Sequence, residues 1–122
     1  MKPLDSKERV VINIHDAEFE PFLTDHGETD GHFLQLDRSK GVGKGFYIYR
    51  MEPGYTTVPH EHIGVEEFLI LSGEITDHDG YTYREGDLVS LKGGTQHCSH
   101  TENGCLIAVY SESFESTFEE NS

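Results

Sequence analysis

Short apolar segments separated by turn-forming residues recur along the chain, and they determine its predicted architecture. The segments are rich in β-branched and aromatic residues, which favours β-strands. The run that ends at Leu71 is four residues long, so these segments are short. We therefore predict strands at Val10–Ile14, Phe33–Leu36, Phe46–Met51, Phe68–Leu71 and Leu88–Leu91.

Glycine-containing turns bound these segments. Ser72 and Gly73 follow Leu71 and are expected to end that strand, while the glycine-rich run 41–45 reads as a turn before Phe46. The dipeptides at 79–80 (Asp-Gly) and 103–104 (Asn-Gly) are typical of β-hairpin turns. Short strands at regular spacing with such turns between them predict an all-β barrel or sandwich.

The two ends of the chain differ in composition from the middle. Residues 1–9 are polar and expected to be loosely held, residues 10–111 form the predicted folded domain, and residues 112–122 form an acidic tail. In the tail, Phe114 and Phe118 are four residues apart and would share one face of a helix. The sequence therefore leaves two alternatives for this segment, a helix or a frayed acidic end.

Length and charge restrict the classes of function. The 122 residues suit one domain. The 9 Lys and Arg against 23 Asp and Glu give a formal net charge of −14, which argues against nucleic acid and anionic membranes, because both are polyanions. No apolar run approaches a membrane span, and no apolar signal region begins the chain. Cys98 and Cys105 are expected to stay thiols, so we predict a cytoplasmic protein.

Three histidines and one glutamate form the candidate site. His60 and His62 are one residue apart, so in an extended segment both imidazoles point the same way. Glu66 follows at another even offset, and a closed barrel would deliver His97 opposite the pair. Three neutral imidazoles and one carboxylate suit a divalent first-row metal. The resulting net charge of +1 with open positions would accept an anionic or chelating substrate, or dioxygen.

Less specific interpretations of these side chains stay open. A metal-free protein would keep the four residues as a polar pocket, and His100, three residues after His97, is an alternative ligand. Strand alternation is expected to turn His100 and Cys98 away from the site.

The spacing of these residues resembles the first signature motif of the cupin family. Every fixed position of that motif is matched, in the order Gly54, His60, His62, Glu66 and Gly73. The second cupin motif is matched from Gly86 to His97, with two departures. Lys92 stands where the family usually has proline, and Thr101 replaces its usual asparagine.

This resemblance implies a double-stranded β-helix (jelly roll) that binds a metal inside the barrel through His60, His62, Glu66 and His97. Within the family, residues 60–73 look most like the cupin domain of ChrR-type zinc-binding anti-sigma factors. We expect no preceding sigma-binding domain in this chain, so the likeness implies the module and its ligands without sigma-factor regulation.

The resemblance leaves two main functions open. One is a small-molecule enzyme of dioxygenase, isomerase or lyase type that uses one divalent Zn, Fe, Mn, Ni or Co ion. The other is a metal-dependent sensing or binding module without catalysis, and an interaction module without metal is a third. Since Glu66, Phe68 and Ile70 would line the barrel, Leu69 and Leu71 would face outward, and we predict a homodimer that covers them.

Overall fold

The computed structural model describes residues 1–118, and its regular structure is entirely β. No helix in that part of the chain is long and apolar enough to cross a membrane. The strands are β1 Glu20–Leu23, β2 Thr29–Leu34, β3 Gly45–Met51, β4 His60–Glu61, β5 Glu66–Asp77, β6 Thr82–Arg84, β7 Leu88–Leu91, β8 Gln96–His97, β9 Ser99–His100, β10 Cys105–Ser111 and β11 Ser116–Thr117.

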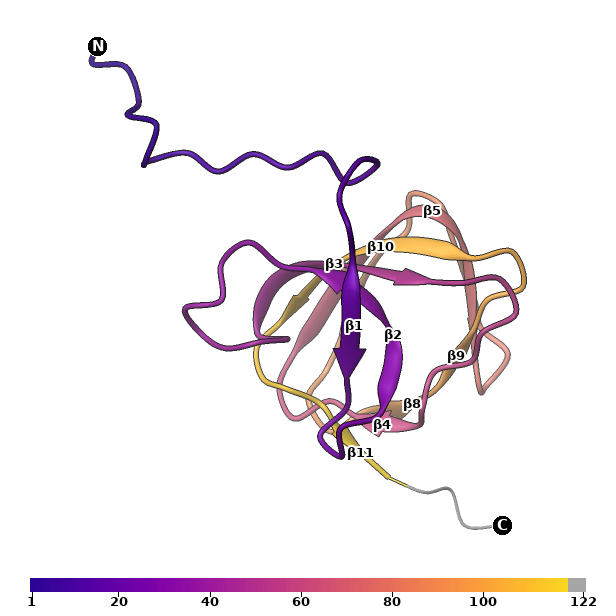
Figure 1. The fold of residues 1–122 in the computed structure, drawn as a ribbon. Helices are drawn as coiled ribbons and strands as arrows, with labels where there is room; N and C mark the ends of the chain where they lie inside the picture. The colour runs from indigo at the N-terminus through magenta and orange to yellow at the C-terminus, as the bar shows by residue number, and fades with distance from the viewer. Residues whose placement is uncertain (119–122) are drawn as a thin grey trace.

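Two antiparallel sheets curl around one interior (Figure 1). The larger sheet has the order β1-β2-β3-β10-β5 and continues from β5 to β7 at one end and to β6 and β9 at the other. The smaller sheet has the order β11-β4-β8. This arrangement is the predicted double-stranded β-helix, or jelly roll.

Strand β5 changes its inward-facing parity part-way along. Glu66, Phe68 and Ile70 are buried in its first half, as predicted, whereas Ile75 and Asp77 are buried in its second half. The register against β10 shifts between Ile70 and Ser72, so Leu71 is an extra residue of a β-bulge. The bulge turns the odd-numbered residues inward, and it brings Asp77 to the same interior as Glu66.

Several strand and turn predictions are confirmed. Strand β3 covers Phe46–Met51 and β7 coincides with Leu88–Leu91, whereas β2 shares only Phe33 and Leu34 with the strand predicted at Phe33–Leu36. The predicted hairpin turn at 79–80 joins the paired strands β5 and β6, whereas the turn at 103–104 joins β9 to β10, which pair with other strands. The predicted end at Ser72 is wrong, because β5 continues through the bulge to Asp77.

The prediction of a strand at Val10–Ile14 is wrong. This segment has no strand partner, and Val10 and Val11 are 70% and 79% exposed. In Figure 1 it is part of an extended N-terminal arm that leads away from the barrel. High β-propensity does not make a strand without a partner for the backbone groups. Strand β1, which was not predicted from the sequence, has such a partner in β2.

The C-terminal tail is extended up to Phe118, so the helical interpretation is wrong for residues 112–118. Strand β11 pairs with β4, which joins the tail to the smaller sheet. The frayed-end interpretation also fails for this part of the tail, while residues 119–122 lie outside the described chain.

Candidate metal centre

The smaller sheet brings three histidines together inside the barrel. His60 on β4 is directly opposite His97 on β8, and His62 follows β4 by one residue. The ring centroids are 4.6 Å apart for His60 and His97, 4.7 Å for His62 and His97, and 5.1 Å for His60 and His62. All three residues are buried, and His62 is only 2% exposed. The predicted common face of the two neighbouring histidines is therefore present.

A hydrogen bond at Nδ1 orients each imidazole. His60 Nδ1 donates to the carbonyl oxygen of Val58 at 2.8 Å, and His97 Nδ1 donates to the Asp77 carboxylate at 3.0 Å. His62 Nδ1 lies 3.0 Å from Thr95 Oγ1, whose own proton goes to the carbonyl of Lys92. With the Nδ1 atoms engaged, each neutral ring keeps the lone pair of Nε2 for a ligand.

Glu66 completes the predicted set. Its Oε2 lies 3.3 Å from His62 Nε2 and accepts a hydrogen bond from Ser111 Oγ at 3.3 Å. Burial opposes the charged forms of both residues, but their mutual attraction outweighs it. The pKa of Glu66 is lowered and the pKa of His62 is raised. Without a metal, the two side chains therefore form a buried ion pair.

Asp77 is a site residue that the sequence did not reveal as one. Its carboxylate accepts hydrogen bonds from His97 Nδ1, from Ser99 Oγ at 2.6 Å and from Tyr83 OH at 2.8 Å. Burial acts to raise the pKa of Asp77, but the His97 ring and the two hydroxyls outweigh it, so the pKa is lowered. Ionised Asp77 thus holds the ring of His97 in position. Strand alternation alone could not place it here, because its parity depends on the bulge at Leu71.

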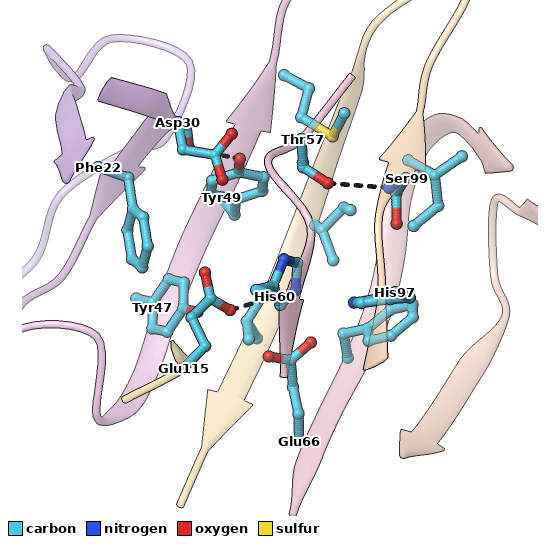
Figure 2. Close-up of a pocket in the computed structure, with 15 residues that line it drawn as sticks. Phe22, Asp30, Tyr47, Tyr49, Thr57, His60, Glu66, His97, Ser99 and Glu115 are labelled. Atoms are coloured by element: carbon cyan, nitrogen blue, oxygen red, sulfur yellow. Dashed lines mark hydrogen bonds and ion pairs between the residues drawn. The ribbon is translucent and has the colours of Figure 1, made fainter. Parts of the chain in front are cut away.

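Glu115 is the second residue that sequence reasoning missed. It comes from the tail just before β11, and its Oε2 lies 3.4 Å from His60 Nε2 (Figure 2). Burial, followed by the charge of Glu66, raises the pKa of Glu115 to about 7 against the attraction of His60. No motif marked this residue, because the spacing in the tail suggested only a helix or a frayed end.

These residues fit a transition-metal ion. The ligand atoms of His60, His62 and His97 lie within 4.8 Å of one another, and so do those of His62, Glu66 and Glu115. Among the described residues, His62 Nε2 is a buried polar atom with no hydrogen-bond partner. Its nearest charged neighbour, Glu66 Oε2, lies 3.3 Å away as an ion pair without a hydrogen bond, and a metal ion would bind both atoms. Imidazole and carboxylate together suit the first-row divalent metals.

A cavity of about 50 Å³ lies beside this cluster in the barrel interior. Its wall combines the polar cluster with apolar and aromatic side chains (Figure 2). None of the described residues that line it is a lysine or an arginine. The lining residues include Phe22, Tyr47, Tyr49, Met51, Phe68, Ile75, Ile107 and Val109 on the apolar side, and Asp30, His60, Glu66, His97 and Glu115 on the polar side.

The other candidate side chains lie outside this centre. His100 contacts Thr56 through Nδ1 at 2.7 Å and Glu102 through Nε2 at 3.1 Å, away from the three clustered imidazoles. The expectation that alternation turns it outward is thus confirmed. Cys98 is half-buried, and burial raises the pKa of the Cys105 thiol to about 12, so that this thiol is unreactive.

A family model described as the ChrR cupin-like domain matches residues 7–115. The chain belongs to the ChrR cupin-like family of cupins. The resemblance in the two motifs is therefore confirmed for the family. No curated protein sequence matches this cupin.

Solved structures share the fold of this cupin at low sequence identity. The acetylacetone dioxygenase from Acinetobacter johnsonii is 17% identical with a TM-score of 0.73, and the alignment covers 99% of this cupin and 84% of that chain. The polyketide cyclase RemF from Streptomyces resistomycificus is 15% identical with a TM-score of 0.71, over 93% and 88% of the two chains.

A third neighbour is a regulatory protein. It is the anti-sigma factor ChrR of Rhodobacter sphaeroides, in complex with SigE. The identity is 17% and the TM-score 0.62, and the alignment covers 81% of this cupin and 51% of that chain. The same fold thus occurs in enzymes and in a regulator, so the fold alone does not select a function.

Proposed function

We propose that this cupin is a metal-dependent enzyme that acts on a small molecule, with the metal held by His60, His62, Glu66 and His97. One observation carries the proposal. Three imidazoles, each anchored at Nδ1, converge beside a carboxylate at the wall of a cavity. Zinc, iron, manganese, nickel and cobalt all suit these ligands.

The site residues have two roles: some would hold the ion, and others position these ligands or line the cavity. An ion held by these residues would supply a Lewis acid for an oxygen donor of the substrate. Asp77 and the carbonyl of Val58 keep two imidazoles in the tautomer that presents Nε2 to the ion. The apolar wall, which includes Phe68 and Ile107, excludes water from that side.

The cavity favours a small and largely apolar substrate. Its volume of about 50 Å³ has room for only a few water molecules. Two carboxylates, Glu66 and Glu115, adjoin the imidazoles, and no lysine or arginine lines the described wall. A multiply charged anion would have no positive side chain there, so we propose a molecule with two neutral or singly charged oxygen donors.

A 1,3-dicarbonyl compound fits this description, and acetylacetone is the simplest probe. It is small, it has apolar ends, and its two oxygens can bind one ion. The named substrate of one fold neighbour supports the same choice. The test is to load the protein with each of the five metals and to measure acetylacetone loss and oxygen uptake.

Acetylacetone loss with one of the metals is expected, and oxygen uptake at the same rate would assign a dioxygenase. Loss without oxygen uptake would assign an isomerase or lyase type of reaction. No loss of acetylacetone or of larger 1,3-dicarbonyls with any metal would contradict the proposed enzyme.

The alternative is a metal-dependent sensing or binding module without catalysis. The match to the ChrR cupin-like family and the fold neighbour in complex with SigE favour this function. A module of this kind would bind its ligand without turnover. The two functions therefore separate in a single experiment, which compares binding of acetylacetone with its consumption.

We further propose that the partner of this chain is a second copy of itself. The outer face of the larger sheet carries exposed apolar side chains on neighbouring strands. Phe46 and Tyr110 are cross-strand partners that are 61% and 42% exposed, and Leu88, 79% exposed, is paired with Leu69. A symmetric dimer would cover this face. A cytoplasmic location also stays a prediction.

Light scattering tests the dimer. The mass of the wild-type protein is expected to be twice that of one chain, and Phe46→Glu is expected to halve it by placing a charge in the interface. Tyr81→Ser is the matched control, because Tyr81 is 60% exposed but lies in the β5–β6 turn. A wild-type mass of one chain over a wide concentration range would contradict the proposal.

A further inference from the structure

The C-terminal segment 112–118 forms a strap that is fastened at several points to the barrel. Its first residue donates a backbone hydrogen bond to the carbonyl of Val65 at 3.0 Å, and the amide of Phe118 donates to the carbonyl of Pro59 at 3.1 Å. Between them, Thr117 hydrogen-bonds the Asp25 carboxylate through its amide and its hydroxyl. The strap therefore has a defined position on the barrel.

Aromatic packing fixes the middle of the strap. The ring of Phe114 stacks on Phe22, with centroids 5.9 Å apart and planes 15° from parallel. The main chain at Gly43 passes close to the same ring, and a Cβ atom there would lie only 2.7 Å from it. Since Phe114 is held from two sides, the next side chain, that of Glu115, is directed toward the barrel interior (Figure 2).

Glu115 reaches the imidazole cluster with its carboxylate. Its Oε2 lies 3.4 Å from His60 Nε2, and its ligand atom is within 4.8 Å of those of His62 and Glu66. Ligand atoms around one transition-metal ion lie roughly 3 to 4.5 Å apart, since each bond is about 2.0–2.2 Å long. Glu115 thus lies within ligand distance of His60, His62 and Glu66, whereas no group of ligand atoms among the described residues joins it to His97.

Two largely buried carboxylates lie beside an imidazole nitrogen that makes no hydrogen bond, an arrangement that suits a cation. The side chains of Glu66 and Glu115 are each 12% exposed, and His62 Nε2 is buried without a hydrogen-bond partner among the described residues. No lysine or arginine in that part of the chain lines the cavity. A divalent cation would neutralise both carboxylates and leave the imidazole lone pairs free to bind it.

We propose that Glu115 is a fifth protein ligand of the metal centre, which the strap supplies from the C-terminus. This inference rests on the proposed metal site and extends its ligand set. With two carboxylates, a divalent centre has a net charge of zero instead of the +1 that the sequence alone predicts.

The test compares Glu115→Gln with Glu112→Gln in the full chain. The first substitution keeps the size of the side chain but removes its charge, while Glu112 is exposed on the same strap and serves as the matched control. Zinc affinity is measured by competition with a chelator. The d–d absorption of Co²⁺ is recorded in parallel, because its intensity reports the coordination number.

Glu115→Gln is expected to weaken zinc binding at least about tenfold and to change the Co²⁺ spectrum, whereas Glu112→Gln changes affinity less than about twofold. If Glu115→Gln does not fold, Glu115→Asp keeps the charge but shortens the reach, and it should show the same two changes to a smaller degree. A wild-type spectrum and affinity in these variants would overturn the fifth ligand. A wild-type protein that binds no metal would instead overturn the proposed function.

Discussion

Replacing Asp77 by asparagine tests how strongly the structure prepares the imidazole of His97. Asp77 Oδ1 accepts from His97 Nδ1 at 3.0 Å and from Ser99 Oγ at 2.6 Å, while Oδ2 accepts from Tyr83 OH at 2.8 Å. All three partners are donors toward the carboxylate. An amide keeps one acceptor oxygen and brings a donor to the other position, so one of these contacts must reverse.

The expected size of the effect follows from these contacts. A hydrogen bond to a charged group contributes about 1.5–3 kcal/mol against about 0.5–1.5 kcal/mol for a neutral one. Loss of the charge thus weakens the hydrogen bond that holds the His97 ring by roughly 1–2 kcal/mol. If the asparagine amide donates to His97 and the ring changes tautomer so that Nδ1 accepts, the loss is larger. Since 1.4 kcal/mol corresponds to tenfold, we expect Asp77→Asn to weaken metal binding about 10- to 100-fold.

Chelator competition with zinc measures this loss, and Asp79→Asn is the matched control. Asp79 is exposed in the turn that follows β5, where its carboxylate accepts a hydrogen bond from the amide of Tyr81. The stability of the metal-free protein gives a second readout. The pKa of Asp77 is lowered by folding, so its contribution is present above the usual value of 3.8 and is lost as pH falls through the lower folded value.

On acidification, the metal-free Asp77→Asn variant should therefore lose less stability than the metal-free wild type. The same zinc affinity in both asparagine variants would refute the claim that Asp77 positions His97.

Two further predictions concern pH and the strap. Zinc affinity should be full above about pH 7 and fall below it, because the ion must displace protons from His62, whose pKa is raised, and from Glu115, whose pKa is about 7. The metal-free protein should show the opposite trend. The pKa of Glu115 in the folded protein exceeds its usual 4.5. Its contribution to the free energy of unfolding is therefore full below pH 4.5 and is lost as pH rises through about 7. Calorimetry that shows parallel pH trends with and without zinc would contradict both statements. In the strap, Gly43→Ala should weaken zinc binding more than Gly45→Ala. Both glycines have a positive φ, 75° and 85°, so alanine costs about 1–2 kcal/mol at either position. Only at Gly43 would the added Cβ meet the ring of Phe114. Equal zinc affinities in the two variants would show that the strap does not support the site.

The sequence predicted the orientation of those site residues whose side-chain direction follows from strand alternation. His60 and His62 share a face because they lie at an even offset in an extended segment. Glu66 and Phe68 are buried in the first half of β5 for the same reason. The cupin motif supplied the pairing with His97, which local spacing alone does not determine.

The missed residues depend on features that have no local signal. Asp77 points inward only because the bulge at Leu71 changes the parity of β5. Glu115 reaches the site because the strap packs on Phe22 and pairs with β4, both far away in the sequence. The strand predicted at Val10–Ile14 failed for the converse reason, since its local propensity is high but no partner strand lies beside it.

Metal analysis of the purified protein tests the central claim most directly. The protein is isolated without chelator or affinity tag, and its transition-metal content is measured for wild type, His62→Ala and His26→Ala. His26 is an exposed histidine outside the cluster, with 69% of its side chain accessible, and it controls for adventitious binding. We predict about one divalent ion per chain in wild type and His26→Ala and almost none in His62→Ala. Metal-free wild-type protein that also takes up none of the five metals, or equal metal content in all three proteins, would contradict the account.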